Sequence, residues 1–118
     1  MQFTIEPKAD LLHAKVWGRD TTQPPFHICE AIMTEARRLG LVRILVELSQ
    51  KVPLTGTGQF MLVERLPSLG FTPQHRIALV HHTHGFFEAN DMIGIVAENR
   101  GLNVRNFRDV TAALAWLG

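Results

Sequence analysis

The chain has 118 residues, 46% of them apolar, and its 12 Lys and Arg nearly balance its 11 Asp and Glu. A chain of this length can bury roughly 65% of the surface that its unfolded form exposes, so we expect residues 1–118 to form one domain and not two. Because charges of one sign never gather into a run, the composition argues against a protein that binds nucleic acid or an anionic membrane surface.

The N-terminal segment is predicted to form a β-hairpin. Residues 2–6 and 11–17 contain β-branched and aromatic side chains, and the turn formers of residues 7–10 separate them. The sequence therefore predicts two strands joined by a short turn.

A helix is predicted to follow the hairpin. Thr21 and Thr22 offer helix caps, and Pro24 and Pro25 fit only the first turn of a helix. At helical spacing one face is apolar, and it comprises Cys29, Ile32, Met33, Ala36 and Leu39. Gly40, followed by leucine, predicts a left-handed cap at the end of this helix.

Two short apolar runs in the middle of the chain predict buried strands. Residues 43–48 and 76–80 have the nearly continuous apolar pattern of parallel strands that helices cover on both faces. Between them, residues 57–66 are predicted to form a helix whose buried side chains are Phe60, Val63 and Leu66. Pro67 is expected to end or kink that helix, because proline removes a backbone hydrogen bond.

The C-terminal third repeats the alternation of helix and strand. A helix is expected over residues 85–100, with inward-facing Phe86, Ala89, Ile93, Val96 and Ala97. Gly101, again followed by leucine, predicts a second left-handed cap. A strand over residues 103–107 then leads to a helix capped by Asp109, which is expected to bury Val110, Ala113, Leu114 and Leu117.

These elements predict an α/β fold. We expect a single mixed, mostly parallel sheet of about five strands, made from the N-terminal hairpin and the β-α units that follow, with about four flanking helices. The crossovers between parallel strands are expected to be right-handed.

The order of elements and two stretches of sequence resemble the STAS and SpoIIAA-like family. The sequence ILVELS at residues 44–49, followed by TGTG at residues 55–58, is similar to the buried strand and phosphorylation loop of that family. Residues 98–109 and 113–117 are similar to the ending of uncharacterised bacterial SpoIIAA-like proteins, some of which are considered related to lipid-binding folds. The resemblance covers nearly the whole chain and implies a scaffold that engages a protein partner through the loop after the third strand.

The phosphorylation loop departs from the family pattern. The family's anti-sigma-factor antagonists have Asp, then a phosphorylatable Ser, a variable residue and Gly, whereas this chain has Thr55, Gly56, Thr57 and Gly58. The hydroxyl of Thr57 is displaced by one residue, so we do not expect the phosphorylation switch of those proteins.

The candidate binding site is expected at the carboxyl-terminal edge of the sheet. Ligands of open α/β sheets bind there, beside helix N-termini. Three loops are expected to meet at this edge, at residues 49–58, 81–85 and 108–109. Their candidate ligand- or partner-binding residues are Ser49, Thr55, Gly56, Thr57, Gly58, His82 and His84. The threonines fit either an anion site or ordinary helix N-capping.

The sequence HHTH at residues 81–84 raises the question of a metal site, because neutral imidazoles are common metal ligands. His81 and His82 should point to opposite sides if the strand continues through them, and a carboxylate such as Glu88 would have to complete the site. We therefore expect a solvated turn, with no metal and no cofactor.

Apolar residues away from the predicted core faces are further candidates. Met61, Phe87 and Ile95 fit a partner surface, a homodimer interface, the edge of an apolar pocket, or ordinary scattered exposure. Trp17 and Trp116 are expected at the edges of the core.

The single cysteine, Cys29, excludes an internal disulfide and suits a reducing compartment. Charged residues interrupt the first 14 positions, where a signal peptide would be apolar, and no apolar run approaches the roughly 20 residues of a membrane span. We expect a soluble, cytoplasmic protein.

Three functions follow, in order of preference. The first is a non-catalytic module that engages a protein partner through the loop after the third strand and the following helix. The second is a carrier of a small amphipathic or lipid-like ligand, with its acidic head at Thr55 or Thr57 and its tail at Phe87 or Ile95. The third is a metal-dependent enzyme at His82 and His84. Because no nucleophile motif is present, we do not expect an enzyme.

Overall fold

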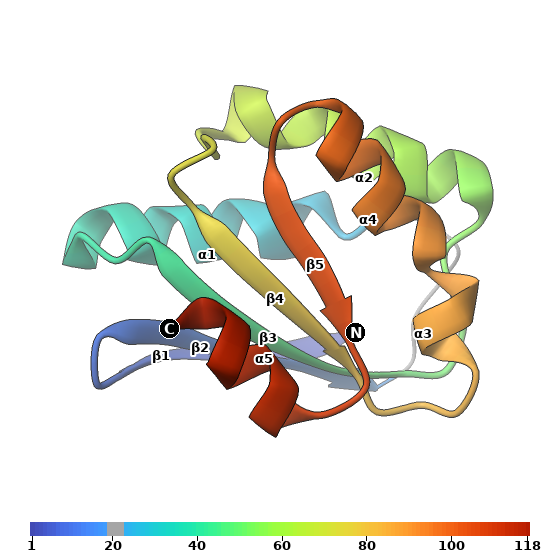
Figure 1. Cartoon of the computed structure of the whole chain (residues 1–118), viewed down its shortest axis with the longest axis horizontal. Helices are drawn as coiled ribbons and strands as arrows, with labels where there is room; N and C mark the ends of the chain where they lie inside the picture. Colours follow the sequence, from blue (N-terminus) through green and yellow to red (C-terminus); the bar gives the residue numbers. More distant parts are fainter. Residues whose placement is uncertain (19–22) are drawn as a thin grey trace.

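The computed structural model describes residues 1–18 and 23–118, which contain one five-stranded mixed sheet (Figure 1). Its strands are β1 (Gln2–Lys8), β2 (Leu11–Gly18), β3 (Arg43–Gln50), β4 (Arg76–His81) and β5 (Asn103–Phe107). They lie in the order β1-β2-β3-β4-β5, so neighbours in the sheet are neighbours in the sequence. The hairpin of β1 and β2 is antiparallel, and every other pair is parallel. The predicted α/β fold is confirmed.

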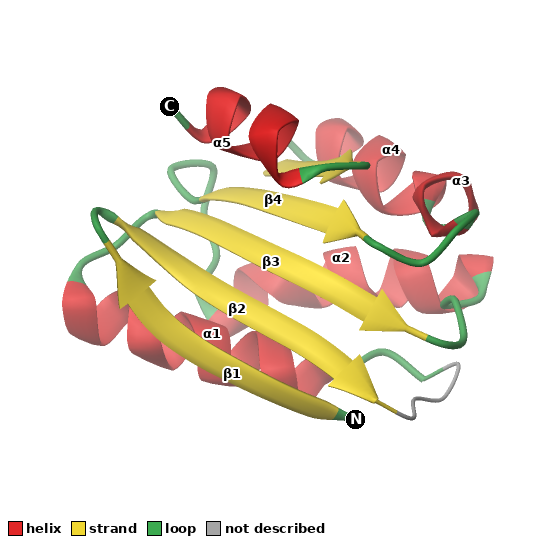
Figure 2. Cartoon of the chain, turned by 90° about the horizontal axis from the view of Figure 1, so that it is seen from below, coloured by secondary structure: helices red, strands yellow, loops and turns green. Residues whose placement is uncertain are grey.

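The helices cover the two faces of the sheet unequally. They are α1 (Phe26–Leu39), α2 (Gly56–Leu69), α3 (Phe86–Ala89), α4 (Asp91–Asn99) and α5 (Val110–Leu117). Figure 2 shows α1 to α4 behind the sheet and α5 in front of it, with the crossovers running in the right-handed sense. The larger core lies under α1, α2 and α4, and a smaller one lies between α5 and strands β3 and β4.

Alternation along each strand divides its side chains between these two cores. On β4, Ile77 belongs to the larger core and its neighbour Ala78 to the smaller one. On β3, Val46 and Leu45 are divided in the same way. The short apolar runs of the sequence therefore mark strands that are buried on both faces, as predicted.

The parallel register brings the ends of β3 and β4 to one edge of the sheet. Leu48 pairs with His81, and the backbone N–H of His82 donates to the carbonyl of Leu48 at 2.9 Å. The hydroxyl of Thr83 donates to the carbonyl of Gln50 at 2.6 Å. The loops that follow these two strands thus begin at a common edge, as expected.

Both Gly-Leu pairs form the predicted helix ends. Gly40 has a φ of 67°, and the N–H of Leu41 donates to the carbonyl of Ala36 at 2.9 Å. Gly101 has a φ of 71°, and Leu102 donates to Ala97 in the same way. At the start of α1 the N-cap is Pro25, which supplies no side-chain bond, and the predicted caps Thr21 and Thr22 lie outside the described residues.

Several predicted details were wrong. The helix expected over residues 85–100 is divided at the buried Asn90 into α3 and α4, which leaves Ala89 exposed. Phe60 is 41% exposed and Leu114 is 42% exposed. On α2 the buried residue beside Phe60 is Gln59, whose amide donates hydrogen bonds to neighbouring carbonyls. The adjacent Phe60 therefore points away from the buried face.

Two element ends also differ from expectation. β1 continues through Pro7 to Lys8, because a proline on an edge strand can leave its missing N–H on the unpaired side. α2 continues past Pro67 to Leu69 and ends at Gly70, which has a φ of 109°. Among the described residues no helix is long and apolar enough to cross a membrane.

Candidate functional site

The threonine-glycine segment forms the N-terminus of α2. Thr55 is the N-cap, and its hydroxyl accepts a hydrogen bond from the N–H of Gly58 at 3.0 Å. Gly56 lies against α4, because a Cβ there would approach the sulfur of Met92 at 3.4 Å. Thr57 is exposed. The sequence left open whether the threonines form an anion site or cap the helix. The hydrogen bond of Thr55 is the one that N-capping requires.

The histidine-rich turn divides between the two faces of the sheet. His81, the last residue of β4, lies on the face that carries α1, α2 and α4, and it is only 5% exposed. His82 lies on the opposite face, where its Nε2 is 2.9 Å from Oε1 of Glu47. His84 is exposed. The predicted opposite orientation of the two adjacent histidines is confirmed.

The remaining predicted residues lie in three separate places. Ser49 and His82 border a shallow hollow on the α5 side of the sheet, together with Lys15 and Trp17. Phe87 and Ile95 border a groove of about 600 Å³ along β5. Met61 is exposed on α2.

The Thr55–Gly58 segment therefore does not meet these other candidates in one site. Within residues 1–18 and 23–118, no three His, Cys, Asp or Glu side chains are placed to hold a metal ion.

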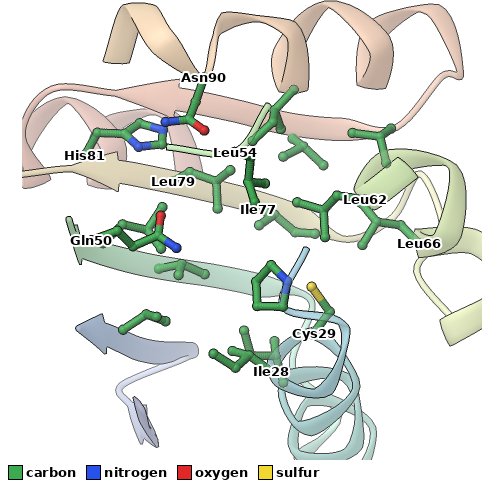
Figure 3. Close-up of a pocket in the computed structure, with 18 of the residues that line it drawn as sticks. Ile28, Cys29, Gln50, Leu54, Leu62, Leu66, Ile77, Leu79, His81 and Asn90 are labelled. Carbon is green, nitrogen blue, oxygen red and sulfur yellow. The ribbon is translucent and has the colours of Figure 1, made fainter. Parts of the chain in front are cut away.

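The structure contains instead an apolar cavity of about 90 Å³ between the sheet and helices α1, α2 and α4 (Figure 3). Its floor comprises Val16, Val46, Leu48, Ile77, Leu79 and Val104. Its walls include Ile28, Cys29, Leu62, Leu66 and Ile93 from the three helices, and Leu54 from the loop before α2.

The helices leave space above the two central strands. Leu48 and Leu79 lie on β3 and β4 and face the helical layer, yet each is only partly buried. Because both line the cavity, some of their remaining accessible surface faces it. Protein interiors normally contain few voids larger than a water molecule, so a space of this size is unusual.

One end of the cavity is polar. Gln50, His81 and Asn90 are all buried and line it, and Figure 3 shows them at the end opposite Leu62 and Leu66. They are brought there by the ends of β3 and β4 and by the break between α3 and α4. The cavity therefore has the two-part character of a site for an amphipathic molecule.

His81 is held by a chain of hydrogen bonds. Its Nε2 lies 2.8 Å from Oδ1 of Asn106, and Nδ2 of Asn106 donates to the backbone carbonyl of Asn90 at 3.0 Å. Its Nδ1 is buried and makes no hydrogen bond within the described part of the chain. Burial lowers the pKa of His81, an effect that the bond to Asn106 opposes and that the charge of His82 adds to.

Gln59 ties the segments beside the cavity together. Its amide nitrogen donates to the carbonyl of Leu54 at 3.1 Å and to that of Ala89 at 2.7 Å. The loop before α2 and the end of α3 are thus fixed to one another through a side chain of α2. This cross-link holds Leu54 in the cavity wall.

Cys29 is the ionisable wall residue on the α1 side. Burial raises the pKa of its thiol to about 12, although a backbone hydrogen bond opposes the effect. The group therefore stays an uncharged thiol at neutral pH, which agrees with its predicted place on the core face.

A second cluster lies on the opposite face of the sheet. One carboxylate oxygen of Glu47 lies 2.5 Å from Nε2 of His13, and the other is hydrogen-bonded to Nε2 of His82. Burial raises the pKa of Glu47, but the hydrogen bonds from His82 and His13 outweigh it and hold the pKa below its usual range. The cluster joins β2, β3 and the residue that directly follows β4, on the same face of the sheet as α5.

Sequence reasoning missed both polar groups. Ile77, Leu79 and His81 alternate along β4, and that spacing was the available signal that His81 belongs with the core. Glu47, a single charge inside the apolar run of β3, was the signal for the second cluster. Asn90 has no comparable signal, because its burial depends on where the helix breaks.

Comparison of the chain with models of known families finds no family that matches, and comparison with curated proteins finds none of significant similarity. Function is therefore inferred from the geometry of these sites alone.

Proposed function

We propose that this domain binds a small, mainly apolar ligand in the cavity between its sheet and helices α1, α2 and α4. The observation that carries the proposal is the cavity itself, which is apolar along its length and has three buried polar side chains at one end. A ligand in this space would bury its apolar surface against these side chains, and that burial would supply the favourable free energy of binding.

The ligand class is the amphipathic one expected from the sequence, but the proposed site is different. Thr55 and Thr57 do not line the cavity, and neither do Phe87 and Ile95. The polar end of the ligand is instead assigned to His81 and its two buried neighbours, and the apolar end to the side chains between α1 and α2.

The test is a variant that fills the cavity. Leu79→Phe adds volume inside the cavity, so we expect it to weaken binding of 1-butanol at least tenfold, as measured by ¹H–¹⁵N NMR titration. Ile95→Phe makes the matched change on the exposed surface of α4 and should leave binding within twofold of the unaltered protein.

Both variants should keep Tm within about 5 °C of the unaltered protein, which shows that any loss of binding is local. Butanol binding that survives in the folded Leu79→Phe variant would contradict the proposal.

A second candidate function is the protein-binding module that the STAS-like resemblance implies. It is favoured by neighbouring exposed apolar side chains, since Phe60 and Met61 are exposed on α2 and Met92 of α4 lies against the start of that helix. A homodimer is one form that this contact could take.

Met61→Ala and Thr57→Glu should weaken capture of a partner without lowering Tm, because both residues are exposed. Sedimentation equilibrium separates self-association from capture of a different protein. Capture unchanged in both variants would count against this function.

A further inference from the structure

The hydrogen bonds around His81 determine which ring nitrogen carries the proton. The amide of Asn106 is oriented by its Nδ2, which donates to the carbonyl of Asn90, so its Oδ1 faces the ring. That oxygen can only accept, and Nε2 of His81 must therefore be the donor. In the neutral imidazole the proton lies on Nε2, and Nδ1 has a free lone pair.

This lone pair is an unmet acceptor in a ligand-sized space. His81 lines the cavity, and Nδ1 is buried without a hydrogen-bond partner among the described residues. Figure 3 shows the ring at the polar end, beside Asn90. Buried acceptors in folded proteins are nearly always paired with protein or with ordered water, so the donor for Nδ1 comes from a molecule in the cavity, either water or a ligand that displaces it.

The lining restricts the charge of that molecule. The described residues that line the cavity include no Lys, Arg, Asp or Glu. A carboxylate or an ammonium group would lose its hydration there without gaining a partner of opposite charge. A carboxylate would also offer only acceptors to a nitrogen that itself accepts. The ligand is therefore uncharged and must carry a donor.

The volume restricts its size. One water molecule occupies about 30 Å³ of the liquid, and an engineered cavity of 150 Å³ holds benzene. A space of about 90 Å³ consequently accepts about four or five non-hydrogen atoms. This is the size of a short alkyl group with one hydroxyl.

From these restrictions we infer that the ligand is an uncharged alcohol whose hydroxyl donates a hydrogen bond to Nδ1 of His81 and whose alkyl group lies among the apolar side chains. The inference rests on the proposed function, since it names the ligand class of the same cavity.

The test compares two isomers that differ in one donor. 1-Butanol can donate to Nδ1, whereas methyl propyl ether has the same atoms but no donor. NMR titration should give a Kd about tenfold lower for the alcohol, because only the alcohol satisfies the buried acceptor. The ¹⁵N signal of Nδ1 should move upfield with the alcohol and stay in place with the ether.

Variants of His81 provide the control. His81→Leu removes the acceptor and should raise the Kd for 1-butanol about tenfold, while the Kd for the ether stays within twofold. His81→Asn keeps an oxygen or nitrogen near the position of Nδ1 and should retain part of the preference.

Equal affinities with an unmoved Nδ1 signal would overturn the inference and leave the cavity as an apolar binding site. Binding of neither isomer to the unaltered protein would overturn the proposed function as well. If His81→Leu does not fold, the Nδ1 signal of the unaltered protein decides the matter.

Discussion

Glu47 shows how one charged side chain can be accommodated in an otherwise apolar strand. Its two carboxylate oxygens contact His13 and His82, which lie on β2 and directly after the end of β4, the two neighbours of β3. His13 is buried and Glu47 is largely so. Removing the carboxylate would leave two imidazoles without their acceptor.

We expect Glu47→Gln to lower the free energy of unfolding by about 1–3 kcal/mol at pH 7, because an amide replaces the charged acceptor of a largely buried pair. Urea unfolding measures the change. Glu98→Gln, on the exposed surface of α4, is the matched control and should change stability by less than about 0.5 kcal/mol.

The difference between Glu47→Gln and the unaltered protein should also depend on pH. The pKa of Glu47 is lower in the folded protein than its ordinary value of 4.5, so its contribution is fully present above that value. It is lost as the pH falls through the lowered pKa of the folded state. The difference in unfolding free energy between the two proteins should therefore be smaller at pH 3 than at pH 7, and a difference that grows toward pH 3 would contradict this expectation.

For single residues, the sequence predicted the direction of a side chain better than its hydrogen-bond partner. The opposite directions of His81 and His82 follow from strand geometry alone and were predicted. The partner of each histidine was not, because Asn106 and Glu47 reach them from other strands. Those contacts depend on strand order, which the pattern of one chain segment does not contain.

At the scale of elements, α2 illustrates what local signals determine. Its N-cap hydrogen bond joins Thr55 and Gly58, and both residues are recognisable in the sequence as a helix start. Its buried face is determined by its packing against α4 and α1. The face predicted from periodicity therefore missed by one residue at Phe60.

Substitutions at Thr55 test how much the N-cap hydrogen bond of α2 contributes to stability. Thr55→Ala should lower the free energy of unfolding by about 1 kcal/mol, because the N–H of Gly58 loses its acceptor. Thr55→Ser keeps a hydroxyl and should cost less than half as much. Thr57→Ala, in the exposed first turn, is the control. Chemical denaturation of the three variants measures the differences, and equal losses for residues 55 and 57 would show that the cap contributes little.

At the scale of the whole molecule, the sheet could be predicted and the cavity could not. Alternating apolar and amphipathic segments, with Gly-Leu pairs at helix ends, are enough to predict parallel β-α units. Membership of the STAS-like family stays a prediction. The cavity arises where helices from three separate units fail to fill the space above Leu48 and Leu79. The size of this unfilled space depends on the summed volumes of side chains that are distant in sequence, and no local sequence pattern encodes that sum.

The strand order has a consequence for folding. Because each strand pairs with the one that precedes it in the chain, the sheet can grow from the hairpin outward without any strand being inserted between two others. Such a topology shortens the loops that must close at each step, which favours rapid folding. A chain emerging from the ribosome could therefore add one β-α unit at a time, with the edge of the last strand exposed until the next is synthesised.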